Sequence, residues 1–304
     1  MKDLFGCFQN EYQNFTVFQD EAGCKDSNFF YHGFLFIDNQ FGKNILNKLI
    51  EIKKINKKRY IEISFKKIRA GSNKKEGYKA KIALEWLNLA RQWLISKKIR
   101  FYLLGINKNN LGNFWNNIWR YDKNIYLRFF KMGLKGSIKW FGNDKELIKP
   151  LFISHLFYEY GNYIDERRNI IKWLSKDFFR ELLNHHNAQT IFSDEKKQEL
   201  LDSRLSDFSN LAQLNDLLLG VCKYSFIKLN PKHKGRLECI NNFSDIIERF
   251  NNKEKAFDIY SEFYKVFCIN FFPRNKINKR FGGGLGIKNM TKTTKNKRNY
   301  LGLR

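Results

Sequence analysis

Residues 15–37 read FTVFQDEAGCKDSNFFYHGFLFI and predict a β-hairpin. The first part, FTVF, is aromatic and β-branched, which suits a buried strand. It ends in the adjacent carboxylates Asp20 and Glu21, a polar turn follows, and residues 29–37 form a second apolar run of strand length. We therefore expect a hairpin that carries two acids at the end of its first strand.

Placing a carboxylate at the end of a buried strand costs free energy unless a cation lies close enough to neutralise it. A metal ion is one usual partner for such a group. The alternative is a surface turn whose acids are solvated, and residues elsewhere in the chain have to decide between the two.

The charge of the chain indicates a polyanionic partner. Its 304 residues contain 56 Lys and Arg against 30 Asp and Glu, for a formal net charge of +26. Such a field attracts nucleic acid, DNA or RNA, and raises its association rate. A membrane surface is the weaker alternative, because we see no basic amphipathic helix with an exposed apolar face. No apolar run approaches the ~18 residues of a membrane span, and the first residues lack a signal-peptide core, so we expect a cytoplasmic protein without a membrane partner.

Composition also bounds the fold. A hydrophobic content of 43% and an aromatic content of 16% suffice for a folded core, in one large domain or two ordinary ones. The five cysteines are scattered, odd in number and without CxxC spacing, so we expect reduced structural thiols and no zinc site.

Hydrophobic periodicity predicts alternating strands and helices after the hairpin. Helical spacing marks residues 43–55, 80–95, 165–184, 210–226 and 242–267, and strand-like runs mark residues 60–65, 99–106, 151–158 and 189–192. We expect an α/β fold in which helices cover a mixed sheet. Trp86 and Trp93 lie on an apolar helical stripe and are expected to be core anchors rather than platforms for bases.

Three basic regions are candidate nucleic-acid contacts. Residues 66–81 form a basic loop that leads into a helix, residues 107–149 form an insertion that interleaves aromatic and basic side chains, and residues 271–304 form a basic, glycine-containing tail. The insertion resembles a single-stranded nucleic-acid surface, but a small packed helical subdomain has the same composition, and we prefer packing for most of its rings. The candidate contact residues are Lys66, Lys67, Arg69, Lys74, Lys75, Lys135, Lys139 and Arg280.

Three carboxylates occupy informative places. Asp20 ends the first strand, Glu62 lies in the middle of the predicted strand 60–65, and Asp216 lies on the nearly all-apolar helix 210–226, three residues after Gln213. Each of two acids also has a structural interpretation. Glu62 could be a solvated side chain on the exposed face of an edge strand, and Asp216 could be a structural residue that forms hydrogen bonds. If the three converge in one cleft, oxygen-only ligation indicates Mg²⁺ or Mn²⁺.

The order of these acids resembles the ribonuclease H-like superfamily, closest in layout to RuvC-type Holliday-junction resolvases. More specifically, FQDEAG, FFYHGFLFI, IEISFKK and LDSRLSDFSNLAQLNDLLLGV resemble the bacterial family of domain of unknown function 3800, over roughly residues 12–228. The residues that match the family pattern are Asp20, Glu21, Glu62, Asp202, Ser203, Gln213 and Asp216, with Asp165 in a possible further acidic element. Asn215 and Ser64–Phe65 depart from that pattern.

The resemblance implies a ribonuclease H-like domain, which we place over residues 1–228. The pattern of the remaining chain predicts a helical extension over 229–270 and the tail beyond it. The resemblance also implies a nuclease that hydrolyses phosphodiesters with two metal ions held by Asp20, Glu62 and Asp216. Glu21, Asp165, Asp202 and Gln213 would be auxiliary residues. The alternative is a catalytically inactive nucleic-acid-binding subunit of a ribonucleoprotein or defence complex, and a protein that acts through a protein partner is a third possibility.

Overall fold

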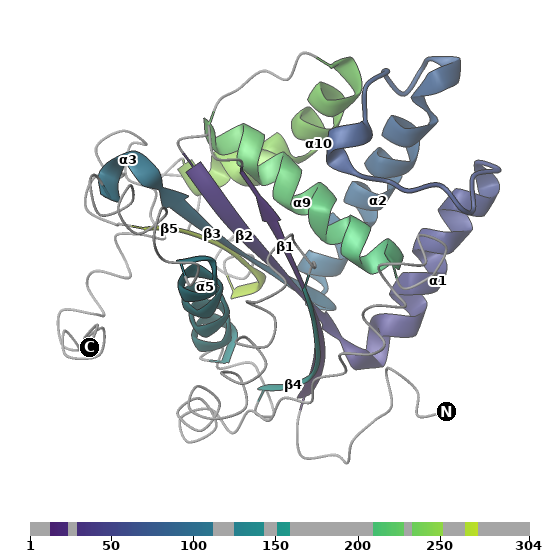
Figure 1. The fold of residues 1–304 in the computed structure, drawn as a ribbon. Coiled ribbons are helices and arrows are strands. Elements are labelled where there is room, and N and C mark those ends of the chain that lie inside the picture. Colours follow the sequence, from purple (N-terminus) through teal and green to yellow (C-terminus); the bar gives the residue numbers. More distant parts are fainter. Residues whose placement is uncertain are drawn as a thin grey trace, which may run out of the picture.

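The computed structural model describes residues 13–23, 29–111, 125–142, 151–158, 209–227, 233–251 and 265–272. They form one mixed sheet with helices on both faces (Figure 1). The strands are β1 (Gln13–Ala22), β2 (Phe29–Asp38), β3 (Ile99–Asn107), β4 (Leu151–Tyr158) and β5 (Phe267–Phe272). The helices are α1 (Asn39–Ile55), α2 (Tyr78–Ile95), α3 (Lys108–Leu111), α5 (Ile125–Gly142), α9 (Ser209–Ile227) and α10 (Lys234–Asn251), with short 3₁₀ turns at Phe65–Lys67 and Lys75–Gly77.

The sheet has the strand order β4-β1-β2-β3-β5. Strands β1, β2 and β3 form an antiparallel meander, whereas β4 pairs in parallel with β1 and β5 pairs in parallel with β3. The predicted hairpin is confirmed, and its register places Asp20 opposite Gly33. The expected α/β class with a mixed sheet is confirmed as well.

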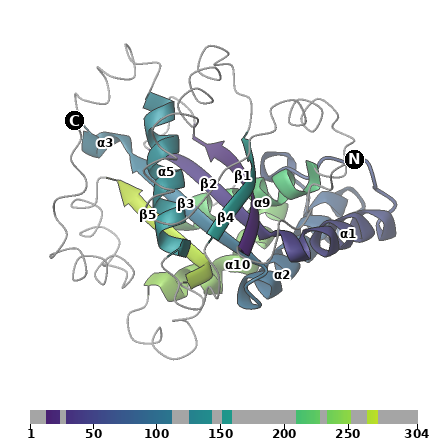
Figure 2. The ribbon, with the colours of Figure 1, turned by 90° about the horizontal axis from the view of Figure 1, so that it is seen from below.

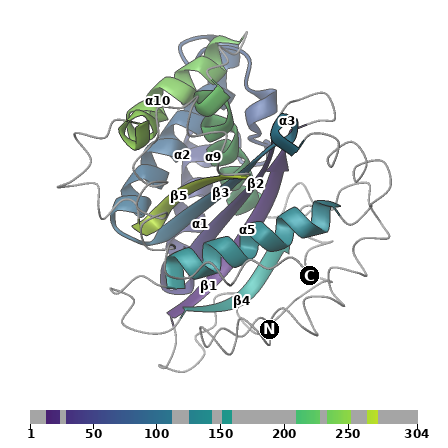
Figure 3. The ribbon, with the colours of Figure 1, turned by 90° about the vertical axis from the view of Figure 1, so that its left-hand side faces the viewer.

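The two faces of the sheet carry different layers. Helices α1, α2, α9 and α10 lie on one side, and α5 lies on the other (Figures 2 and 3). Strand alternation divides the hairpin between them, since Phe18 and Leu35 belong to the core under α9, whereas Val17 and Phe34 belong to the core under α5.

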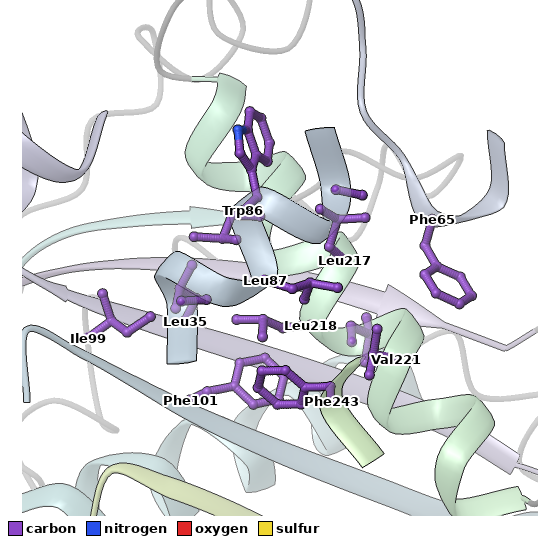
Figure 4. Packing of buried hydrophobic residues seen from close by; sticks show 14 of the residues in the cluster. Leu35, Phe65, Trp86, Leu87, Ile99, Phe101, Leu217, Leu218, Val221 and Phe243 are labelled. Atoms are coloured by element: carbon purple, nitrogen blue, oxygen red, sulfur yellow. The ribbon is translucent and has the colours of Figure 1, made fainter. Parts of the chain in front are cut away.

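The larger core joins the strands to four helices, α1, α2, α9 and α10, and Figure 4 shows part of it. Trp86 of α2 is fully buried there, and its indole Nε1 donates to the backbone oxygen of Leu49 at 3.2 Å. Trp93 is also buried, which confirms that both tryptophans are core anchors. Phe243 reaches this core from α10 and contacts the ring of Phe267 on β5, at 6.0 Å between centroids. Residues from the last described part of the chain therefore share the core of the first hairpin.

Helix α5 packs its aromatic face against the sheet. Phe130 and Phe141 are fully buried, and a Cβ on Gly136 would meet the hydroxyl-bearing ring of Tyr102. The interpretation of the insertion as a packed helix is confirmed for these rings. On the same face, His32 is fully buried beside Phe30 and Phe130, and burial lowers the pKa of its imidazole to about 3.

Two predicted elements differ from the structure in the described residues. Residues 60–65 do not join the sheet, because the peptide N–H groups of Ile63 and Phe65 bond to side chains of α9 instead of a neighbouring strand. The helix predicted over 242–267 is confirmed over 242–251, but it begins earlier, at Lys234, and Phe267 belongs to the strand Phe267–Phe272. The predicted helix 165–184, strand 189–192 and tail beyond residue 272 lie outside the described residues.

Three of the five cysteines lie in the described residues, and all three are free, buried thiols: Cys222, Cys239 and Cys268. Burial, reinforced by the nearby charge of Glu238, raises the pKa of the Cys239 thiol to about 12. All three side chains belong to the hydrophobic cores, which agrees with the prediction of structural thiols. None of the helices in the described ranges has the length and apolar character needed to cross a membrane.

Candidate functional site

Asp20 lies near the end of β1, on the face that α9 covers. Its cross-strand partner Gly33 lies directly under the helix, since a Cβ on Gly33 would contact Leu219 Cδ1 at 3.3 Å and Asn215 Oδ1 at 3.5 Å. Paired residues of two neighbouring strands direct their side chains to the same face. The half-buried carboxylate of Asp20 therefore points toward the α9 side of the sheet, and its Oδ1 accepts the backbone N–H of Glu21 at 2.7 Å.

Asn215 fixes α9 to this end of the hairpin. Its fully buried side-chain amide donates to the backbone oxygens of Phe18 at 3.1 Å and Gly33 at 3.3 Å, one on each strand. The next residue along the helix is Asp216. The structure thus places Asp20 on β1 and Asp216 on α9, the helix that packs on this strand. That the two carboxylates share a cleft stays a prediction.

Asp216 and Gln213 bind the chain between α1 and α2. Asp216 Oδ2 accepts the backbone N–H of Phe65 at 2.7 Å, and Gln213 Oε1 accepts the backbone N–H of Ile63 at 2.8 Å. Both side chains therefore satisfy peptide groups of an extended segment that pairs with no strand among the described residues. The structural alternative considered for Asp216, a hydrogen-bonding residue, describes this contact.

Two further residues extend the same stripe of α9. A Cβ on Gly220 would collide with the ring of Phe65, and the ring of Tyr224 lies 5.4 Å from that of Phe65 between centroids. Gln213, Asp216, Gly220 and Tyr224 follow one another at intervals of three, four and four residues, so they share one helix face. This face forms a dock for residues 61–67.

Glu62 does not lie on a strand, and its carboxylate pairs with the ammonium of Lys67. The Glu62 side chain is 34% exposed and that of Lys67 is 47% exposed, so this is a surface ion pair of small net stability. The prediction of Glu62 as a strand acid is therefore wrong, because alternation of Ile61, Ile63 and Phe65 marks an extended segment and does not identify its hydrogen-bonding partner.

The metal centre expected from Asp20, Glu62 and Asp216 is not assembled by the described residues on their own. Within those ranges, no group of three or more His, Cys, Asp and Glu side chains has a geometry that could hold a metal ion. Glu21 lies beside Asp20, but by strand alternation it belongs to the opposite face. Asp165 and Asp202, the other auxiliary acids, lie outside the described residues.

A buried lysine supports the dock and was missed by the sequence analysis. Lys53 of α1 is 2% exposed, and its Nζ donates to Asn210 Oδ1 and, at 3.0 Å, to Gln213 Oε1. The same ammonium lies 5.0 Å from the centroid of the Trp86 ring. Gln213 Oε1 thus accepts from both Lys53 and the backbone of Ile63, so α1 and the docked segment are joined through one amide.

Residues 66–75, here called the basic loop, follow the docked segment directly. They contain five basic residues and no acid. Four of the five, Lys66, Arg69, Lys74 and Lys75, are exposed and make no ion pair with any residue that the structure describes. Lys67 is exposed as well, but Glu62 neutralises it.

The N-terminal turns of α10 hold the basic loop through its backbone. Arg236 donates from Nε to the oxygen of Ile68 at 2.9 Å and from Nη2 to that of Lys66, and Glu238 Oε2 accepts the N–H of Ser72 at 2.7 Å. The backbone N–H of Gly235 donates to the oxygen of Arg69 at 3.1 Å. The sequence analysis missed these residues because a charged residue on an amphipathic helix gives no sign of its partner.

The remaining basic candidates lie elsewhere. Lys135 and Lys139 are exposed on α5, across the sheet from the basic loop, so the two sets do not form one continuous surface (Figure 3). Arg280 lies outside the described residues. Comparison of the chain with protein-family models, with curated proteins and with solved structures gives no match.

Proposed function

We propose that this chain binds nucleic acid through the basic loop, on an α/β scaffold of ribonuclease H-like layout. The observation that carries the proposal is the way in which the loop is held. Helices α9 and α10 bind its backbone and that of the segment before it, while Lys66, Arg69, Lys74 and Lys75 project into solvent. Fixed cations facing solvent suit a phosphate backbone, since ordering them on binding costs little entropy in the main chain.

The scaffold part of the proposal rests on strand order and on α9. An antiparallel meander of β1, β2 and β3, with β4 parallel to β1, supports a ribonuclease H-like sheet. A late helix that carries an acid across the first strand supports the same layout. The chain would then be a nucleic-acid-binding subunit, of the kind that works within a larger ribonucleoprotein or defence complex in the cytoplasm.

The proposal is tested by the salt dependence of binding, measured by fluorescence anisotropy with labelled DNA and RNA. Each phosphate contact that is lost lowers the slope of log K against log salt by about one. We expect this reduction for Lys66→Ala, Lys74→Ala and Lys75→Ala, and no change for Lys43→Ala, an exposed lysine of α1. Slopes unchanged by the three substitutions in the basic loop would contradict the proposal. Lys135→Ala and Lys139→Ala show in the same assay whether α5 contributes.

A metal-dependent nuclease is the second candidate, and the placement of Asp20 on β1 and of Asp216 on α9, the helix that packs on β1, favours it. The carboxylates of Asp20, Asp216 and Glu62 are oxygen ligands of the type that Mg²⁺ and Mn²⁺ prefer, and such an ion activates water for phosphodiester hydrolysis. In the described residues Glu62 instead pairs with Lys67, so the site would need acids from elsewhere, such as Asp165 or Asp202.

The second candidate is tested by calorimetric titration of Mn²⁺ or Mg²⁺ into the wild type and into Asp20→Asn, together with a cleavage assay. Saturable binding that Asp20→Asn removes, and cleavage that Asp20→Asn and Asp216→Asn abolish while nucleic-acid binding survives, would support a nuclease. Metal-dependent cleavage retained in both variants would rule out these acids as ligands.

A further inference from the structure

Tyr60 is an exposed aromatic side chain beside the basic loop. Its side chain is 63% exposed, whereas most large apolar side chains of the described chain are buried. It follows the cations Lys57, Lys58 and Arg59, and the basic loop begins six residues later. From residue 57 to residue 75 the chain has eight basic residues and one acid, Glu62, which Lys67 neutralises.

The backbone under Tyr60 is held on both sides. Before it, Lys57 adopts a positive φ of 55°, and the N–H of Lys58 donates to the oxygen of Lys53 at 2.8 Å, which closes the end of α1. After it, the N–H of Ile61 donates to the oxygen of Lys58 at 3.1 Å, and Gln213 binds the N–H of Ile63. The ring therefore stands on a fixed segment.

The cations next to Tyr60 lie against aromatic rings. The Arg59 guanidinium carbon is 5.3 Å from the centroid of the Tyr60 ring, and Lys58 Nζ is 4.8 Å from the centroid of the Tyr78 ring. Tyr60 faces solvent, whereas Ile63 is buried in the larger core and Ile61 packs against that core. An exposed ring among exposed cations is the pairing that binds a base and its neighbouring phosphates.

We infer that Tyr60 is a stacking platform for a base of single-stranded nucleic acid, whose phosphates contact the basic loop. The inference rests on the proposed nucleic-acid binding and adds the strandedness of the ligand. In a duplex the faces of the bases are covered by their neighbours, so the ring can stack only on an unpaired base. Every base has such a face, so the site discriminates strandedness rather than sequence.

The test compares single-stranded and duplex ligands. Labelled oligo-dT and oligo-rU are titrated with wild type, Tyr60→Ala, Tyr60→Phe and Lys66→Ala, each strand alone and each annealed to its complement. Loss of one stacked base weakens binding about tenfold. We expect that loss for Tyr60→Ala on the single strands only, with an unchanged salt slope, while Tyr60→Phe binds like wild type. The DNA and RNA arms identify the sugar, and the loss in either arm supports the inference.

The failure of this inference can be distinguished from failure of the proposed function. If Tyr60→Ala binds single strands as wild type does while Lys66→Ala lowers affinity and salt slope, the loop binds nucleic acid and the stacking inference is overturned. If wild type binds neither ligand in a salt-dependent way, the proposed function fails as well. Urea unfolding of each variant checks the fold, and Tyr60→Ala should unfold like wild type because the ring is exposed.

Discussion

The backbone N–H of Phe65 donates a 2.7 Å hydrogen bond to Oδ2 of Asp216. A carboxylate on a helix thus supplies the acceptor that a neighbouring strand would supply in a sheet. One turn later on the helix, Gly220 leaves the space in which the Phe65 ring lies. The spacing of the acid and the glycine on α9 thus has a packing explanation that is independent of catalysis.

Two substitutions distinguish the hydrogen bond that Asp216 accepts from the charge that it carries. Asp216→Ala leaves the half-buried N–H of Phe65 without its acceptor and should lower the free energy of unfolding by about 1–3 kcal/mol. Asp216→Asn keeps an oxygen that can accept, so it should lower stability by much less. Urea unfolding of both variants measures the difference, and equal stability of Asp216→Ala and wild type would contradict this role.

Gly220 and Phe65 should be coupled in a double-mutant cycle. Gly220→Ala adds a Cβ where the Phe65 ring lies, and overpacking of this kind costs about 1–3 kcal/mol. In a Phe65→Ala background the ring is gone, so the same alanine should cost far less. Urea unfolding of the two single variants and the double variant gives the coupling. Additive effects would mean that the ring does not depend on the glycine.

Arg236 should control access to the basic loop. Arg236→Ala removes the donors to the backbone oxygens of Ile68 and Lys66, so trypsin should cleave faster after Lys66, Lys67 and Arg69. Limited proteolysis followed by mass spectrometry measures these sites. Lys81→Ala, which removes an exposed cation from α2, is the control and should leave the cleavage rate unchanged.

The stability of the protein should fall in mild acid because of His32. Its folded pKa of about 3 lies below the ordinary value of 6.5, so the unfolded chain binds the proton more tightly. The contribution is complete above pH 6.5 and is lost as the pH falls toward 3, amounting to about 1 kcal/mol between pH 7 and pH 5.5.

The control for this prediction is His32→Asn, which removes the titrating ring. The asparagine keeps an acceptor for the side-chain amide of Gln19, whose Nε2 lies 3.1 Å from His32 Nδ1 in the wild type. Urea unfolding at the two pH values should show a smaller acid loss in the variant than in the wild type. Equal losses in both proteins would assign the pH dependence to other groups.

Local patterns predicted four of the five strands of the sheet, β1 to β4. The hairpin, β3, β4 and α9 all lie within a few residues of the predicted bounds, because each has an apolar period and turn residues of its own. The segment around Glu62 was mistaken for a strand because Ile61, Ile63 and Phe65 alternate both in a strand and in an extended segment that binds a helix. Only the partner differs, and that partner lies about 150 residues away in α9.

The candidate site was predictable in part. The helical pattern placed Asp216 on a late helix, and the structure packs that helix, α9, on the strand that carries Asp20. The ion pair of Glu62 and the backbone contacts of Arg236 depend on tertiary packing that no local pattern contains. Lys53 did leave a signal, since it shares the apolar face of α1 with Leu46, Leu49 and Ile50. A lysine on such a face indicates an internal acceptor, here the side chains of Asn210 and Gln213.

The parallel pairing of β5 with β3 places a late segment of the chain on an early edge of the sheet. While the chain is being synthesised, the outer backbone groups of β3 have no partner in β5 until residues 267–272 have emerged. Pairing across so much intervening chain forms slowly, and an open strand edge is prone to pair with other molecules. A chain that stops before Phe267 should therefore aggregate during folding, even though the whole hairpin and the basic loop are present.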